Sequence, residues 1–89
     1  MPHYVYILQS QLDLSFYKGY SENPKHRLLQ HNDGQTPSTR HLRPWKLVYV
    51  ELLNSKRDAL IREKNLKKAS RDRIHALLAN HKNIVSLFL

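Results

Sequence analysis

Residues 4–8 read Tyr4-Val5-Tyr6-Ile7-Leu8, and this stretch decides the fold. Its β-branched and aromatic side chains favour a strand. Because apolar residues fall on both alternating faces, we expect an inner strand of a sheet covered on both sides. A second strand is predicted over residues 15–20, and the polar segment 9–14 is short enough to join the two as a hairpin. A hairpin symmetric about the middle of that segment places Tyr6 opposite Tyr17, with both phenols on one face.

Helix-start signals follow the hairpin. Asn23 is a good N-cap, and Pro24 suits the first helical position, where its missing N–H costs nothing. The helix should run to about Asn32 and stop before the glycine at position 34. Arg27 and His31 are four residues apart, so their side chains share one face of this helix.

The rest of the chain predicts one more strand and two helices. A loop over residues 35–44 leads to a strand over 47–53. Ser55 followed by Asp58 resembles a capping box, and Ser70 can cap a last helix. The buried sides of these two helices should contain Ala59, Leu60 and Leu66 in the first and Ile74, Leu77, Leu78 and His81 in the second. The order β-β-α-β-α-α indicates an α+β fold, a small, mostly antiparallel three-stranded sheet flanked by helices.

The chain is small and strongly basic. It has 89 residues, with 15 Lys and Arg against 7 Asp and Glu and a formal net charge of +8. The length predicts one domain over residues 1–89. The charge indicates a polyanionic partner, of which nucleic acid is the commonest, although basic residues also serve solubility alone.

Several classes of protein are excluded by what the sequence lacks. Without cysteine there is no disulfide framework, thiolate zinc site or cysteine nucleophile, which fits a cytoplasmic location. The start has no signal-peptide pattern, and no apolar run reaches the roughly 18 residues of a membrane span, so we expect no membrane association. Two glycines are too few for a glycine-rich phosphate loop.

One carboxylate stands out from the charged surface. Glu63 lies four residues after Ala59 and three before Leu66, in the middle of an apolar helical stripe. Desolvating an unpaired carboxylate is costly, so this position favours a functional role. The structural alternative is an ion pair between Glu63 and Arg27, which would be weak evidence for stability.

Taken in order, these motifs resemble the GIY-YIG nuclease superfamily. Val5-Tyr6-Ile7 and Tyr17-Lys18-Gly19 are similar to its paired motif, although Val5-Tyr6-Ile7 replaces the Gly-Ile-Tyr order and Lys18 replaces an Ile. The segment 23–32, the loop and strand from Thr39 to Tyr49 and the helix around Glu63 resemble its further motifs. The resemblance spans about residues 4–80 and is nearest to the small, single-domain bacterial branch (UPF0213-like).

The resemblance implies a divalent-metal-dependent endonuclease. Tyr6 and Tyr17 match the motif tyrosines, one of which activates or orients the attacking water. Arg27 matches the arginine that steadies the scissile phosphate. His31 matches a position that assists proton transfer or hydrogen-bonds a tyrosine. Glu63 matches the single metal ligand, normally on Mg²⁺ or Mn²⁺, and the glycine at position 19 matches one that neighbouring groups approach closely.

We expect DNA as the partner, structured or damaged DNA in repair or recombination rather than a defined sequence, because 89 residues leave no room for a separate reading domain. Trp45 should anchor its loop to the core.

The alternatives to an autonomous nuclease are a non-catalytic nucleic-acid-binding module, and a nuclease subunit that needs a protein partner or a second copy bound at the apolar tail, residues 84–89. Residues expected to contact nucleic acid are Lys18, Thr39, Arg40, Arg43, Lys67 and Lys68.

Overall fold

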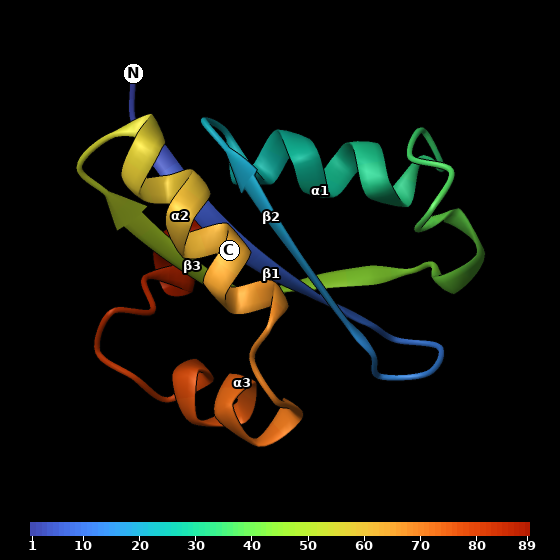
Figure 1. Ribbon diagram of the computed structural model, residues 1–89. Helices are drawn as coiled ribbons and strands as arrows, with labels where there is room; N and C mark the ends of the chain where they lie inside the picture. Colours follow the sequence, from blue (N-terminus) through green and yellow to red (C-terminus); the bar gives the residue numbers. More distant parts are fainter.

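The computed structural model describes all 89 residues and contains one three-stranded antiparallel sheet with helices on both faces (Figure 1). The strand order is β2-β1-β3. The expected α+β class, the antiparallel sheet and the order of the elements are confirmed. The elements are β1 (His3–Ser10), β2 (Phe16–Ser21), α1 (Pro24–Asn32), the 3₁₀ turn η1 (Arg40–Leu42), β3 (Trp45–Leu53), α2 (Lys56–Lys67), α3 (Arg71–Leu78) and the 3₁₀ turn η2 (Val85–Phe88).

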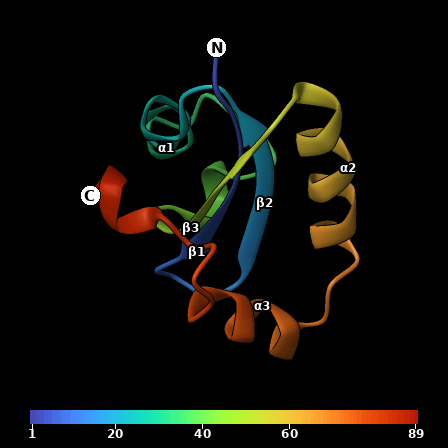
Figure 2. The ribbon, with the colours of Figure 1, turned by 90° about the vertical axis from the view of Figure 1, so that its left-hand side faces the viewer.

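The central strand β1 separates two apolar clusters. Figure 2 shows α1 and the C-terminal segment on one side of the sheet and α2 on the other. Val5 and Ile7 pack with residues of α2 and α3, whereas Tyr6 and Leu8 pack with residues of β3, α1 and the C-terminal segment. All four are completely buried, as the two-faced apolar pattern of β1 predicts.

The predicted pairing of Tyr6 with Tyr17 is wrong by two residues. Tyr6 pairs with Gly19, and Leu8 pairs with Tyr17. The backbone pairing extends further than expected, with the Ser10 N–H donating to the Ser15 carbonyl at 2.9 Å, so the loop is confined to residues 11–14. Because a two-residue shift preserves the face, Tyr6 and Tyr17 still lie on one side, with ring centroids 6.4 Å apart.

A β-bulge in β3 changes which side chains face each layer. Ile7 pairs with Tyr49, but the next residue of β1, Leu8, pairs with Leu47, so Val48 is the extra residue. As a result Leu47 belongs to the cluster around Tyr6, while Tyr49 belongs to the cluster under α2 and α3. The strand begins at Trp45, two residues earlier than predicted.

The first helix and its loop follow their local signals. Asn23 caps α1 by accepting a hydrogen bond from the His26 N–H at 3.2 Å, and Gly34 follows the helix with a φ of +77°. Trp45 is buried and donates from Nε1 to the Thr39 carbonyl at 2.9 Å. The indole therefore anchors the loop to the core, as expected.

The other two helices are capped as predicted, but they bury fewer of their residues than predicted. The hydroxyls of Ser55 and Ser70 accept the N–H of the residue three positions on. Leu60 was expected to be buried but is 43 % exposed, because α2 contacts the sheet along a narrow stripe through Ala59 and Leu66. His81 was expected on the buried side of the last helix, but α3 ends at Leu78 and His81 lies exposed in the following turn.

The C-terminal tail packs back onto the sheet. The Ile84 N–H donates to the Val50 carbonyl at 2.8 Å, and Phe88 meets Tyr4 edge to face with ring centroids 5.2 Å apart. Leu87 and Leu89 point outward and are 77 % and 79 % exposed. Among the helices, none has the length and apolar character that crossing a membrane requires.

Candidate active site

Tyr6 lies at the centre of the polar residues that the sequence singles out. Its ring is completely buried and crosses β2 at Gly19, where an added Cβ would come within 2.5 Å of the phenol oxygen. The phenol oxygen is 3.0 Å from Nε2 of His31. Gly19 therefore does what the resemblance implies, because it leaves room for the close approach of Tyr6.

His31 is held between the sheet and the loop that follows α1. It is completely buried, and its Nδ1 is 2.9 Å from the hydroxyl oxygen of Thr39. Burial and, as a smaller cause, the positive charge of Arg27 together lower the pKa of His31 to about 4. His31 is therefore neutral near pH 7.

Tyr17 completes an aromatic group with these two residues. It lies half-buried on β2, with its ring centroid 4.7 Å from that of His31 and 6.3 Å from that of Trp45. Tyr6, Tyr17 and His31 thus come from three different elements, β1, β2 and α1, and meet on one face of the sheet.

Arg27 lies one helical turn before His31 and is half-buried. Its Nη1 donates to the Gln30 side-chain oxygen at 2.9 Å. Burial raises the pKa of Tyr6 to about 12, the Arg27 guanidinium acts against this rise, and Tyr17 and Glu63 add to it. The charges of Arg27 and Glu63 therefore act on the ionisation of Tyr6 in opposite directions.

Glu63 lies on the side of the sheet opposite α1. It lies on α2, which packs against β1 and β2, and β2 is the edge strand between α1 and α2 (Figure 2). Its carboxylate is 3.4 Å from Nζ of Lys67, one turn later in α2, and its side chain is 20 % exposed. The alternative of an ion pair with Arg27 is wrong, since the only ion pairs are Glu63–Lys67 and Glu51–Arg62.

The donor set around Glu63 limits which metal the site can hold. No cluster of three or more His, Cys, Asp or Glu side chains is present. A metal that takes all its ligands from the protein therefore does not fit. A hard cation such as Mg²⁺ does fit, because it is commonly held by one or two carboxylates and completed by water and phosphate oxygens.

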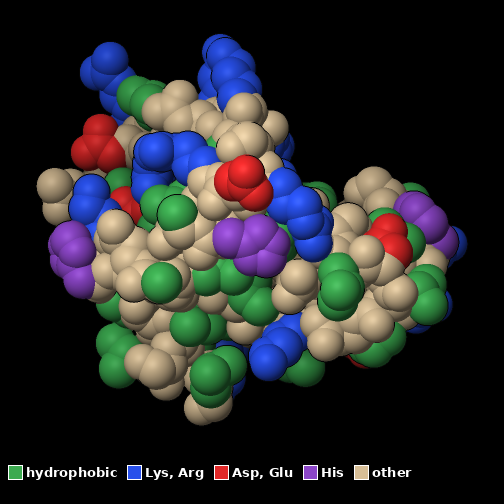
Figure 3. Space-filling view, turned by 90° about the horizontal axis from the view of Figure 1, so that it is seen from below, with side chains coloured by type: hydrophobic (Ala, Val, Ile, Leu, Met, Phe, Trp, Pro, Cys, Tyr) green, Lys and Arg blue, Asp and Glu red, His purple; other side chains and the backbone are tan.

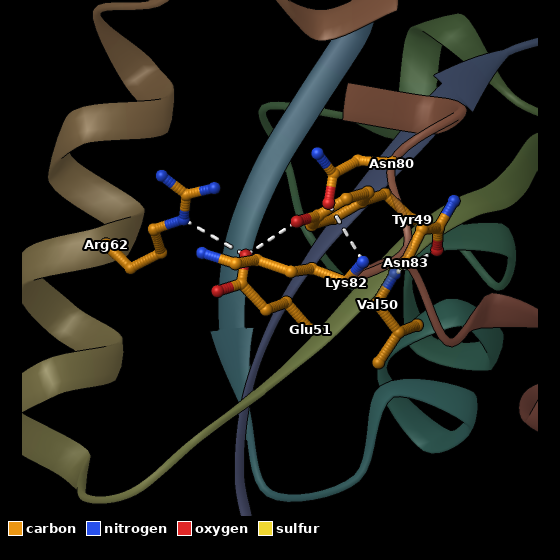
Figure 4. Close-up of polar contacts among 7 residues, drawn as sticks. All are labelled: Tyr49, Val50, Glu51, Arg62, Asn80, Lys82 and Asn83. Carbon is orange, nitrogen blue, oxygen red and sulfur yellow. Dashed lines mark hydrogen bonds and ion pairs between the residues drawn. The ribbon is translucent and has the colours of Figure 1, made fainter. Parts of the chain in front are cut away.

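A polar cluster that includes Arg62, the residue before Glu63 in α2, was missed from the sequence (Figure 4). The Tyr49 hydroxyl donates to Oε1 of Glu51 at 2.6 Å, and Nε of Arg62 donates to the same oxygen at 3.0 Å. Glu51 is only 7 % exposed, and its bond to Tyr49 adds to the effect of burial in raising the pKa of Tyr49 to about 12. The signal that could have found it is Glu51, the one charged residue of the strand predicted over residues 47–53.

The residues expected to contact nucleic acid differ in exposure and in whether another residue already binds them. Arg40 and Lys68 are exposed, and Lys18 is half-buried on β2. Arg43 donates to the Arg40 carbonyl at 2.7 Å, and Lys67 pairs with Glu63. Thr39 is 2 % exposed and lies behind His31, so the expected contact with nucleic acid is wrong for this residue. Figure 3, which views the molecule from below Figure 1, shows most Lys and Arg side chains in the upper part of the picture and hydrophobic side chains nearer the centre and below.

Comparison with known proteins agrees with this arrangement. Residues 2–76 match the family described as the GIY-YIG catalytic domain. The chain therefore belongs to the GIY-YIG family, which places it in a nuclease superfamily.

Bacterial proteins similar to this chain carry the name UPF0213. UPF0213 protein SSP2268 of Staphylococcus saprophyticus is 40 % identical over 72 residues, which are 80 % of this chain and 87 % of the relative. UPF0213 protein SAG0778 of Streptococcus agalactiae is 37 % identical over 84 residues, 93 % of this chain and 94 % of the relative. The solution NMR structure of UPF0213 protein BH0048 from Bacillus halodurans has a TM-score of 0.58 at 34 % identity, with 92 % and 87 % of the two chains covered.

Proposed function

We propose that this protein is a divalent-metal-dependent endonuclease that hydrolyses phosphodiester bonds in DNA. The observation that carries the proposal is the gathering of Tyr6, Tyr17 and His31 on one face of the sheet, with Arg27 one helical turn before His31 and Glu63 on α2, which packs against β1 and β2. Such a set contains what the reaction needs: groups to move a proton of water, a cation for the phosphate and a carboxylate for a hard metal.

Each side chain takes a distinct part in this proposal. Arg27 binds the scissile phosphate and offsets its developing charge. One of Tyr6 and Tyr17 orients the attacking water, and His31 accepts a proton through Tyr6. Glu63 would hold Mg²⁺ or Mn²⁺, which stabilises the leaving oxygen when it is bound.

The proposed substrate follows from the kind of contacts that the surface offers. Exposed cations such as Arg40 and Lys68 bind phosphates, and phosphate contacts carry no sequence information. We therefore infer that shape decides the target, which favours structured or damaged DNA of the kind that arises in repair and recombination.

A nuclease assay with a matched carboxylate control tests the proposal. Glu63→Gln should remove cleavage of branched and nicked DNA in Mg²⁺, while Asp72→Asn, at an exposed position on α3, should cleave like the wild type. The same activity in Glu63→Gln as in the wild type would refute the mechanism. RNA and unbranched duplex in the same series separate the substrate classes.

The ion pair between Glu63 and Lys67 favours a second candidate, a nucleic-acid-binding module without catalysis, because it occupies the carboxylate that a metal would need. This candidate predicts salt-dependent DNA binding with no cleavage in Mg²⁺ or Mn²⁺. A Lys67→Met variant separates the two: it should increase cleavage at low Mg²⁺ if Glu63 binds the metal, and change nothing if the module is inert.

A third candidate is a nuclease subunit that docks on a protein partner or a second copy through its tail. It is favoured by the outward-facing Leu87 and Leu89, which leave apolar surface in water. Sedimentation of the wild type and of a Leu87→Ser, Leu89→Ser variant tests self-association. An identical, monomeric mass for both would refute the second-copy form of this candidate.

A further inference from the structure

A continuous chain of polar groups runs inward from Tyr6. The phenol oxygen is 3.0 Å from Nε2 of His31, and Nδ1 of His31 is 2.9 Å from the Thr39 hydroxyl oxygen. The Thr39 hydroxyl in turn donates to the carbonyl of Thr36 at 3.3 Å. Tyr6, His31 and Thr39 are each at most 2 % exposed, so the chain is closed to bulk water.

Counting hydrogens assigns a direction to this chain. The chain ends on the Thr36 carbonyl, which can only accept. If the Thr39 hydroxyl donates to that carbonyl, its oxygen accepts from Nδ1–H of His31, and Nε2 is then free to accept from the Tyr6 hydroxyl. All three hydrogens then have an acceptor within the protein.

The reverse direction leaves one hydrogen without an acceptor. If Nε2 of His31 carried the proton, it would donate to the Tyr6 oxygen, and the Tyr6 hydroxyl would need another acceptor. His31 is the only acceptor within hydrogen-bond distance of that hydroxyl, and a buried donor without an acceptor is destabilising. Arg27, a donor only, acts on the same phenol and cannot take its hydrogen.

We propose that Thr39 is a positioning residue that holds neutral His31 with its proton on Nδ1, so that Nε2 is set to take the hydroxyl proton of Tyr6. Its catalytic consequence rests on the proposed nuclease function. Because Tyr6 is fully buried in the free protein, this step requires that substrate binding open the phenol to the attacking water. The Tyr6 oxygen then takes a proton from that water while its own proton passes to Nε2 of His31. The hydroxide bonds to phosphorus, the bond from phosphorus to the leaving oxygen breaks, and that oxygen takes a proton from solvent. The imidazolium then returns its extra proton through Tyr6 to solvent.

This relay lets Tyr6 transfer a proton in the reaction although its hydroxyl rarely ionises near pH 7. Burial raises the pKa of Tyr6 to about 12, so a free tyrosinate is rare near pH 7, and the relay keeps Tyr6 neutral throughout. In the free protein the positive charge of Arg27 lowers the proton affinity of His31. A phosphate bound at Arg27 would offset that charge and raise the proton affinity of His31 when substrate is present.

The tautomer of His31 can be read directly, without any assay of activity. In ¹⁵N-labelled protein at pH 7, long-range proton–nitrogen correlation spectra should show His31 protonated at Nδ1 and unprotonated at Nε2, with exposed His26 and His41 as internal references. Thr39→Val keeps the shape and removes the hydroxyl, and it should shift His31 toward the Nε2–H form. Thr39→Ser should restore the wild-type pattern.

The Tyr6→Phe variant and a DNA cleavage assay test the role of Thr39 further. Tyr6→Phe should leave the proton on Nδ1, because Thr39 holds it there; this variant also serves if Thr39→Val does not fold. A wild-type His31 protonated at Nε2, or a Tyr6→Phe variant whose tautomer changes while that of Thr39→Val does not, would overturn it. On DNA, Thr39→Val should lower kcat about tenfold or more with little change in KM. If no form cleaves DNA, the nuclease proposal fails while the spectra still decide the role of Thr39.

Discussion

At the scale of single residues, the absence of a side chain at position 19 determines where Tyr6 lies. Gly19 pairs with Tyr6 across β1 and β2, and the phenol occupies the space that a Cβ would take. A contact of 2.5 Å is too short for any real Cβ, and Tyr6 is completely buried, so its ring cannot swing out into water. The position of the phenol against His31 therefore depends on this one residue.

Gly19→Ala should accordingly both destabilise the protein and displace the phenol. We expect a loss of about 1–3 kcal/mol in the free energy of unfolding, as is usual for overpacking, measured by urea denaturation. Adding Gly19→Ala to Tyr6→Leu should cost much less, because the clashing ring is gone, and the two effects should not add. An unchanged stability in the Gly19→Ala single variant would contradict this view of the contact.

The buried His31 predicts a dependence of stability on pH. Its pKa is about 4 in the folded protein and 6.5 when unperturbed, so the unfolded chain binds the proton first as pH falls. Stability that is complete above about pH 6.5 is therefore lost progressively down to about pH 4, by roughly 3 kcal/mol. Urea denaturation between pH 7.5 and 4 measures this, and His31→Gln should flatten that part of the profile. A His31→Gln profile as steep as the wild type would assign the effect to other groups.

At the scale of elements, α2 is held by few apolar contacts and by one polar cluster. Ala59 and Leu66 are its only buried residues, and Leu60 and Ile61 are about half exposed. Arg62, the residue before Glu63 in α2, donates a hydrogen bond to the buried Glu51 of β3 (Figure 4). Hydrogen bonds are directional where apolar contacts are not, so we expect this cluster to set the rotation of α2 and with it the direction of Glu63.

Substitutions in this cluster should separate stability from positioning. Arg62→Met leaves Glu51 buried without its cation and should cost about 2–4 kcal/mol in urea denaturation. A triple variant, Tyr49→Phe with Glu51→Leu and Arg62→Met, removes every polar partner and should recover most of that stability. If the cluster directs Glu63, the triple variant should stay folded yet cleave DNA more slowly. Full activity in the triple variant would show that apolar packing alone positions α2.

At the scale of the whole molecule, the net charge of +8 should make DNA binding strongly dependent on salt. Each phosphate contact contributes roughly 0.9 to the slope of log affinity against log salt on duplex DNA. Fluorescence anisotropy should give an Arg40→Ala, Lys68→Ala variant a slope smaller by about 2, since both side chains are exposed. Lys82→Ala is the matched control, because Lys82 lies beside Asn83 at the β3 edge of the sheet, away from β2. Equal slopes in all three proteins would place the phosphate contacts elsewhere.

Much of the fold was predictable because its signals are local. The caps Asn23, Ser55 and Ser70 satisfy backbone N–H groups within three residues, so they form wherever the helix lies. Leu60 was mispredicted for the opposite reason: helical periodicity places it near the apolar stripe, but the width of the buried stripe depends on the sheet that α2 meets. The residues of the candidate site were proposed from their order in the chain, whereas the contacts of Thr39 with His31 and of Glu51 with Arg62 join residues distant in sequence.

The sequence by itself determined the strands, the caps and the residue types of the site, because these depend on side-chain chemistry and short-range spacing. It also determined that Tyr6 and Tyr17 share a face, since even a register error of two residues keeps that relation. Only the tertiary structure decided the face of each residue in β3. The alternation from Trp45 to Glu51 reads as one face, but the bulge at Val48 turns Trp45 and Leu47 toward the tyrosines and Tyr49 and Glu51 toward α2. The physical reason is that the bulge lets β3 place apolar side chains in both layers of the core. The need for apolar side chains in each layer arises only when the helices and the sheet are packed together.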